Sequence, residues 1–445
     1  MGASLKEKAE ERNKKPLQAA AWLSLPAAWL SLLFAAQGLA AERLPAGQAV
    51  YTLPPDKLAK AVALSHARTL LFFGDTAWVI LLLSLLVFFG AGGAIRRWAA
   101  GITPRRWLQG LLVAPVWLLI LAVIELPAAL IAQHIDLRFG LSVQGWPSWF
   151  GDWGKSTALT VTFGTLALSA LYLLMRRSPR RWWVWFWILT LPVEVFLVFI
   201  VPIVVDPLFD HFTPLEKSDP ALVQQLERVA ARGHLDIPPN RMFVMDASSK
   251  YTGLNAYVTG FGPSKRIVVW DNTIRLAPMD EILFVYGHEQ GHYVLRHIAK
   301  GLIFYGALLL IFYWVAWRLM RGLISRRDGA GGISSIDDWA SVGLLLLLVT
   351  VLGFFAEPVG NAFSRWEEHQ ADVYGQEVIH GLVADPQQTA VNSFQHLGEI
   401  GLDNPSPNPF VEFWTFSHPS ISERAQFAAQ YDPWRPGNKP QFVKE

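Results

Sequence analysis

The chain has 445 residues, of which 52% are hydrophobic and only 17% are charged, and its formal net charge is +2. This balance excludes a protein that binds nucleic acid through a strongly basic surface, and it is typical of a membrane protein. The absence of cysteine excludes a disulfide framework and thiol catalysis.

Seven apolar stretches are each long enough to cross the hydrocarbon core of a bilayer, which takes roughly 17 to 25 helical residues. They cover residues 17–36, 70–89, 108–132, 157–175, 182–205, 301–317 and 340–356. Several tryptophans lie near their ends, as in the aromatic belts of membrane proteins. We therefore expect a mostly helical, polytopic protein with seven transmembrane helices, surrounded by the lipid bilayer.

The first apolar stretch allows two interpretations. A charged segment precedes it, and the small residues around Ala36 and Ala40 resemble the cleavage region of a signal peptide. Its length of about twenty residues favours a retained membrane helix instead.

A polar segment separates the fifth and sixth apolar stretches. Its pattern predicts a helix over 219–232 that ends at Gly233, and a second helix that begins at Asp280. Short strands are predicted over 241–246, 254–259 and 266–271. We therefore divide the chain into a five-helix membrane region, residues 1–205, and an α+β domain, residues 206–445, that includes the last two membrane helices.

The second of these predicted helices contains the motif HEQGH at residues 288–292. Positions i and i+4 share one face of a helix, so His288 and His292 can both bind one tetrahedral Zn²⁺ ion. Glu289 is then placed to act as general base on a water molecule. His297, five residues beyond His292, is expected to point away from the ligand face, so we interpret it as an outer or interfacial residue. Because such a motif also arises by chance, a third ligand is needed to support it.

Candidates for the third ligand follow the last apolar stretch. Glu368 and Asp372 are again four residues apart. One carboxylate can therefore complete a His₂Glu site while the other hydrogen-bonds a ligating imidazole. Composition alone leaves Glu367 and His369 as alternatives.

Together these motifs resemble those of a known family. HExGH followed by NxxSRxxExxAD, here residues 361–372, is similar to the integral-membrane CAAX prenyl endopeptidases, which are gluzincin zinc metalloproteases. Residues 138–144 and 206–215 resemble further elements of that family, so the similarity covers nearly the whole chain. The resemblance implies a gluzincin-type domain built around a small sheet and the HExxH helix. It also implies one zinc ion per chain with Glu368 as the third ligand, and Asp372 as the outer carboxylate.

The resemblance extends to residues that would hold a substrate. His418 matches a histidine that helps to stabilise the oxyanion in these enzymes, although Ser420 replaces the second proline of the family's HPP element. Asn255 and Ala256 match the edge strand beside the zinc helix, whose free backbone groups can pair with an extended peptide. A purely structural hairpin is the alternative. Arg424 is expected to bind substrate backbone or a carboxylate.

The predicted function is that of a membrane-embedded zinc metalloendopeptidase acting on a peptide or protein, lipidated or not. The resemblance implies cleavage after the prenylated cysteine of CAAX proteins. A quality-control or peptide-trimming protease is the alternative. An inactive membrane scaffold is a remote alternative, because neither Glu289 nor a ligand is lost.

Charge patterning predicts which side of the membrane carries the catalytic domain. Basic clusters near Arg96, Arg105, Arg176 and Arg318 fall on one side of a seven-span chain, and the zinc motifs fall on the other. Short basic loops stay on the cytoplasmic side. We therefore expect a bacterial inner-membrane enzyme with an extracytoplasmic catalytic domain, whereas resemblance to the eukaryotic enzymes implies a cytosolic one.

Overall fold

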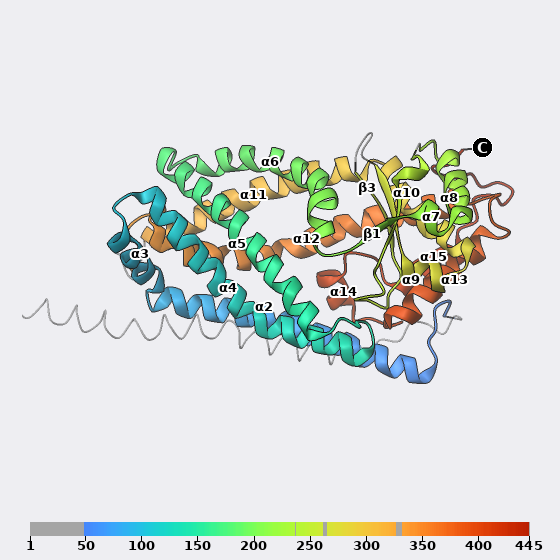
Figure 1. Cartoon of the computed structure of the whole chain (residues 1–445), viewed down its shortest axis with the longest axis horizontal. Coiled ribbons are helices and arrows are strands. Elements are labelled where there is room, and N and C mark those ends of the chain that lie inside the picture. Colours follow the sequence, from blue (N-terminus) through green and yellow to red (C-terminus); the bar gives the residue numbers. More distant parts are fainter. Residues whose placement is uncertain (1–48, 236, 261–264, 326–331, 445) are drawn as a thin grey trace, which may run out of the picture.

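Long helices run along the long axis of the molecule, and a small sheet with shorter helices lies at one end (Figure 1). The structure is a computed structural model and describes residues 49–235, 237–260, 265–325 and 332–444. Within these residues, six helices are long and apolar enough to cross a membrane. They correspond to six of the seven predicted stretches, and the first stretch, residues 17–36, lies outside the described residues.

The N-terminal part of the described chain is a helical bundle. Its helices are α2 (Pro55–Phe88), α3 (Ala91–Ile102), α4 (Arg106–Phe139), α5 (Trp146–Arg177) and α6 (Trp182–Ile200). The sequence did not predict α3, which is short and lies at the end of the bundle far from the sheet (Figure 1). The other four are the first four membrane-length helices of the described chain.

A four-stranded sheet follows α6. Its strands are β1 (Phe212–Pro214), β2 (Met242–Met245), β3 (Ala256–Thr259) and β4 (Arg266–Trp270), in the spatial order β1-β2-β4-β3. β2 and β4 are parallel, and both outer pairs are antiparallel. The three predicted strands correspond to β2, β3 and β4. β1 was missed because three residues are too few to show an alternating pattern.

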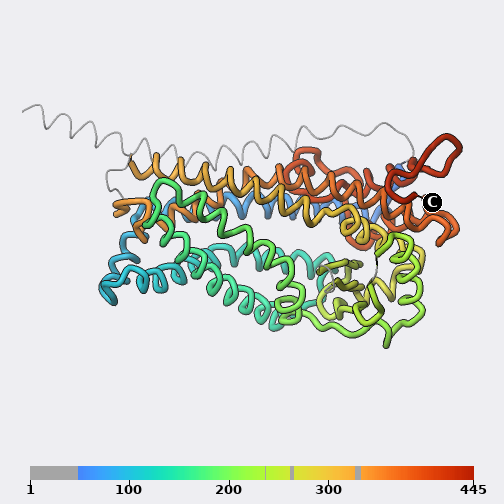
Figure 2. The backbone as a smooth tube through the Cα atoms, turned by 90° about the horizontal axis from the view of Figure 1, so that it is seen from above, coloured from blue at the N-terminus to red at the C-terminus, as the bar shows by residue number. Residues whose placement is uncertain are grey.

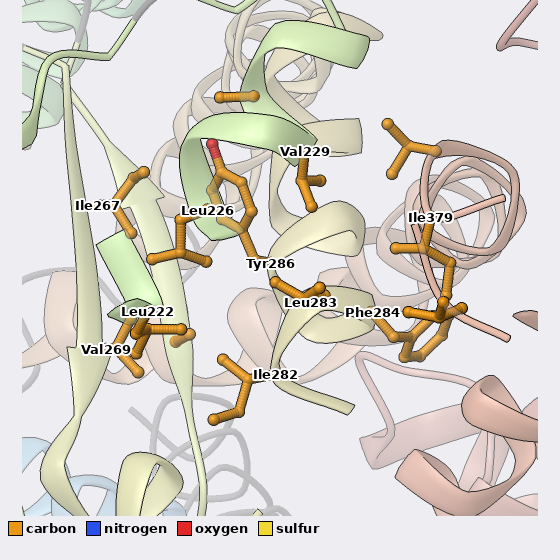
Figure 3. Packing of buried hydrophobic residues seen from close by; sticks show 14 of the residues in the cluster. Leu222, Leu226, Val229, Ile267, Val269, Ile282, Leu283, Phe284, Tyr286 and Ile379 are labelled. Carbon is orange, nitrogen blue, oxygen red and sulfur yellow. The ribbon is translucent and has the colours of Figure 1, made fainter. Parts of the chain in front are cut away.

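Shorter helices lie at the same end of the molecule as the sheet, and all of them except the helix over residues 409–415 contribute apolar side chains to its core. They are α7 (Leu215–Ser218), α8 (Pro220–Arg232), α9 (Asp271–Leu276), α10 (Met279–Val294), α13 (Pro386–Gly401), α14 (Pro409–Thr415) and α15 (Ile421–Gln430). Leu226 of α8, Ile267 of β4 and Leu283 of α10 meet in this core, and each is almost fully buried (Figure 3). The edge strand β3 packs beside α10. This core fixes α10, which carries the HEQGH motif, against the sheet.

The last two long helices connect the bundle to the sheet. They are α11 (His297–Ser325) and α12 (Val342–Val378), and they run alongside each other (Figure 2). With 37 residues, α12 is about 55 Å long at 1.5 Å per residue, well beyond the roughly 30 Å of a hydrocarbon core. Its C-terminal half therefore extends out of the bundle and packs against α10 (Figure 1).

Candidate active site

Small residues let α10 and α12 approach closely where the predicted ligands lie. Gly287 and Gly291 on α10 face Ala371 and Gly375 on α12. A Cβ atom added at Gly375 would lie 2.9 Å from the backbone nitrogen of His288, so a larger residue would not fit without a backbone shift. The two helices therefore bring their polar side chains into one place.

Three side chains converge at this contact. His288 Nε2 and His292 Nε2 are 3.1 Å apart. Glu368 Oε2 lies 3.2 Å from the first of these nitrogens, and Glu368 Oε1 lies 3.4 Å from the second. Their ligand atoms all lie within 4.8 Å of one another, and no other such group of His, Asp or Glu occurs among the described residues. Glu367 is not part of this group, and the ring of His369 packs against an aromatic residue of α15.

These donors fit a zinc ion. Two imidazole nitrogens and one carboxylate oxygen are a usual ligand set of catalytic zinc. His288 Nδ1 donates a hydrogen bond to Asp372 Oδ1 at 2.8 Å, so Nε2 is the ring nitrogen that faces the other two side chains and can bind a metal once it is deprotonated. Glu368 Oε2 is buried and makes no well-aligned hydrogen bond. A cation bound by all three side chains would satisfy this oxygen.

Burial and charge set the protonation of the site. Burial lowers the pKa of His288, but its hydrogen bond to Asp372 and the adjacent carboxylate of Glu368 outweigh burial and raise the pKa to about 10. Burial, followed by the charge on His288, lowers the pKa of His292 to about 3. His288 therefore carries an extra proton in the metal-free site, and a bound metal ion would replace that proton. Burial raises the pKa of Glu289 to about 7, which suits a group that accepts and returns a proton near neutrality.

Arg424 of α15 fixes the outer carboxylate. Its Nε and Nη2 atoms donate to Asp372 Oδ2 and Oδ1 at 2.9 and 2.6 Å, a two-point pair between charged groups. Asp372 therefore bridges Arg424 and His288. Of the two partners expected for Arg424, substrate backbone or a carboxylate, the structure shows the carboxylate.

A cavity of about 170 Å³ is bordered by His288, and His418 and Arg424 border both this cavity and a second one of about 560 Å³. Glu289 and Asn255 line the smaller one. His418 Nε2 lies 3.3 Å from Glu368 Oε2, and its side chain is about half exposed. Ala256 lines neither cavity and is 1% exposed, so its contact with substrate stays a prediction.

Comparison with known proteins agrees with this geometry. The profile of Peptidase family M48 matches residues 216–432. A second profile, described as CAAX prenyl protease N-terminal, five membrane helices, matches residues 37–211. The chain is 35% identical over 376 residues to the uncharacterized metalloprotease YhfN of Bacillus subtilis, which covers 84% of this chain and 86% of YhfN. The chain belongs to peptidase family M48.

Further similarities support this membership. The CAAX prenyl protease 1 homolog of Oryza sativa is 27% identical over 308 residues, covering 67% of this chain and 68% of that protein. The crystal structure of S. mikatae Ste24p matches with a TM-score of 0.77 at 23% identity, covering 93% of this chain and 98% of that one. The fold is therefore shared, and the predicted fold class and family are confirmed. This M48 peptidase is a membrane metalloendopeptidase.

Two side chains that the sequence left without a role hold the segment leading to His418. Arg365 of α12 donates from Nη1 to the backbone carbonyls of Glu412 and Phe416, at 3.3 and 2.6 Å. Asn361, four residues earlier on the same helix face, donates to another carbonyl of this segment at 2.7 Å. The helix that supplies Glu368 thereby also positions the loop of His418. The sequence signal for these contacts was the asparagine and the arginine of the NxxSR motif.

Proposed function

We propose that this M48 peptidase binds one zinc ion through His288, His292 and Glu368 and hydrolyses peptide bonds beside it. The observation that carries the proposal is the convergence of the three ligand atoms at the contact of α10 and α12, next to a cavity. When bound, zinc supplies a Lewis acid that polarises the substrate carbonyl and makes water more acidic.

Residues of the chain carry out proton transfer, oxyanion stabilisation and substrate binding. Glu289 borders the cavity beside the ligands, accepts a proton from the attacking water and passes it to the leaving amine. His418 borders the same cavity and donates a hydrogen bond to the developing oxyanion. Asn255 lies on the wall where the edge strand β3 begins, so an extended peptide can enter along that strand. Arg424 holds Asp372, which in turn orients His288.

Metal analysis and a peptidase assay test this assignment. Purified wild-type protein should contain one zinc ion per chain, and the His288→Ala/His292→Ala double variant should contain none. Glu289→Gln should keep its zinc while turnover falls roughly 10²-fold or more, because the general base is lost. Glu227→Gln makes the same chemical change at an exposed position of α8 and should behave as wild type. Zinc in the double variant, or wild-type turnover in Glu289→Gln, would contradict the proposal.

The proposed substrate is a peptide ending in a prenylated CAAX sequence. This proposal rests on relatives that are named CAAX prenyl proteases. The value of kcat/KM should be higher for a farnesylated CAAX peptide than for the same peptide with an unmodified cysteine. Equal values, together with cleavage of an unrelated unfolded polypeptide, would favour a trimming or quality-control protease instead.

The proposed orientation puts the catalytic end outside the cytoplasm of a bacterial inner membrane. The helix α3, which contains Arg96, and the turn between α5 and α6, which contains Arg180 and Arg181, lie at the end of the bundle far from the sheet (Figure 1). Such basic links stay on the cytoplasmic side. Because the chain has no cysteine, Ser178→Cys and Ser406→Cys can be probed singly with a membrane-impermeant thiol reagent. Labelling of Ser406→Cys alone supports this orientation, and labelling of Ser178→Cys alone contradicts it.

A further inference from the structure

His297 lies against the outer nitrogen of one proposed metal ligand. The helix α10 ends at Val294, and Arg296 has a φ of 59°, a left-handed conformation that turns the chain before α11 begins. As a result, His297 Nδ1 lies 3.0 Å from His292 Nδ1. Residues five apart on an uninterrupted helix do not face each other in this way. The turn at Arg296 therefore creates a contact that the spacing alone does not predict.

The direction of this hydrogen bond follows from the role of His292. A neutral imidazole carries one N–H and one lone pair, so two facing ring nitrogens need one proton between them. His292 Nε2 faces His288 and Glu368 at 3.1 and 3.4 Å, so its lone pair belongs on that side. The proton is then on His292 Nδ1, which donates to the lone pair of His297 Nδ1.

We propose that His297 is a positioning residue that accepts this hydrogen bond and so holds His292 in the tautomer and orientation that bind zinc. The inference rests on the proposed zinc ligation by His292. The other histidine ligand has a matching arrangement, since His288 Nδ1 meets the carboxylate of Asp372 at 2.8 Å. His297 is 3% exposed, so water does not compete for its Nδ1 atom. Outer partners of this kind typically change metal affinity about 10- to 100-fold.

Two substitutions of nearly equal shape separate hydrogen bonding from packing. In asparagine, Oδ1 branches from Cγ as Nδ1 does in histidine, so His297→Asn keeps an acceptor close to the original position. In His297→Leu a methyl group replaces that acceptor with similar volume. The acceptor is thus the main difference between the two variants.

Zinc affinity of the purified full-length chain in detergent, measured by competition with a chromogenic chelator, is the readout. We expect His297→Leu to bind zinc roughly 10- to 100-fold more weakly and His297→Asn to stay within a few-fold of wild type. Wild-type affinity in His297→Leu would overturn the inference, even if the metal-free variant melts at a lower temperature. Equal weakening in both variants would also overturn it, because the acceptor would then not matter.

The His288→Ala/His292→Ala variant in the same assay separates this inference from the proposed function. If that variant keeps zinc, the ligand assignment fails, and the role of His297 fails with it. If it loses zinc while His297→Leu does not, only the role of His297 is wrong.

Discussion

The two ends of α12 differ in what surrounds them. At the bundle end, Trp339 just before the helix stacks on Tyr172 with ring centroids 4.4 Å apart, and the next two turns are mostly buried aliphatic residues. At the catalytic end, the buried side chains include Glu368, Asp372 and Glu377, and the last two of these make several hydrogen bonds. Apolar packing tolerates small changes of position, whereas metal binding is weakened by small displacements of the ligands. Stability and catalysis should therefore be separable along one helix.

The helices α12 and α6 differ in how much of their apolar surface the protein buries. More than half of the apolar stretch of α12 is buried within the protein, whereas none of that of α6 is. α6 is a peripheral helix whose apolar surface faces outward, and α12 is the central one. A central helix is held on several sides, so side chains at its far end have fixed positions.

The largest effect is expected from Glu368→Ala, because it removes the ligand that α12 contributes. This variant should lose its zinc, and its peptidase activity should fall by more than the roughly 10- to 100-fold expected for Asp372→Ala, which removes only an outer partner. Glu367→Ala changes the neighbouring carboxylate and should keep zinc, since Glu367 is outside the ligand group. Zinc content and turnover measure both effects. Loss of zinc in Glu367→Ala with retention in Glu368→Ala would reverse the assignment.

Next in size is the effect of Gly375→Ala, which adds a methyl group 2.9 Å from the backbone of His288. Relief of this clash requires α10 and α12 to separate, at a cost of about 1–3 kcal/mol, and moves the ligands apart. Zinc affinity and the melting temperature should both fall. Gly353→Ala is the matched control on the same helix, because a Cβ atom there meets nothing within 4 Å. Equal zinc affinity in the two variants would show that the close contact is not needed.

A smaller effect is expected from Arg365→Gln, which removes the guanidinium hydrogen bonds to the segment that leads to His418. Turnover should fall about 10-fold, below the ~10²-fold typical of losing an oxyanion donor outright, while zinc content stays unchanged. A double-variant cycle with His418→Ala provides the check. If Arg365 acts through His418, the double variant should be little worse than His418→Ala alone. Fully additive losses would mean that Arg365 acts by another route.

The sequence predicted most of the membrane helices and the face shared by His288 and His292, because both depend on local composition and spacing. Residue spacing alone did not separate Glu368 from Glu367 or His369. The prediction of Glu368 came from a family resemblance, and in the structure Glu368 is the carboxylate that lies beside His288 and His292. A third ligand some eighty residues away depends on how two helices pack, which local pattern does not contain.

Two features that complete the site escaped the sequence analysis. Glycine and alanine four residues apart, at 287 and 291 and again at 371 and 375, are the spacing by which membrane helices pack closely. This signal was present but unused. The left-handed turn at Arg296 had no signal, since arginine rarely adopts a positive φ. Tertiary packing imposes that turn, and His297 reaches His292 only because of it.

The smallest effect on activity is expected at the bundle end of α12. Trp339 Nε1 donates to the carbonyl of Arg106 at 2.8 Å, and Trp339→Phe removes this bond and part of the stacking on Tyr172. The loss should cost about 1–3 kcal/mol and lower the melting temperature. Trp107→Phe, at an exposed tryptophan of the same end, should leave it unchanged.

Zinc content and turnover of folded Trp339→Phe should equal those of wild type, because roughly 45 Å of helix separates this position from Glu368. The measurement is kcat well below the melting temperature, with zinc saturating. A fall in kcat at temperatures where the variant is fully folded would show that strain passes along α12 to the ligands. Unchanged kcat with reduced stability would show instead that the bundle end supports the fold and leaves the chemistry to the residues that meet at α10.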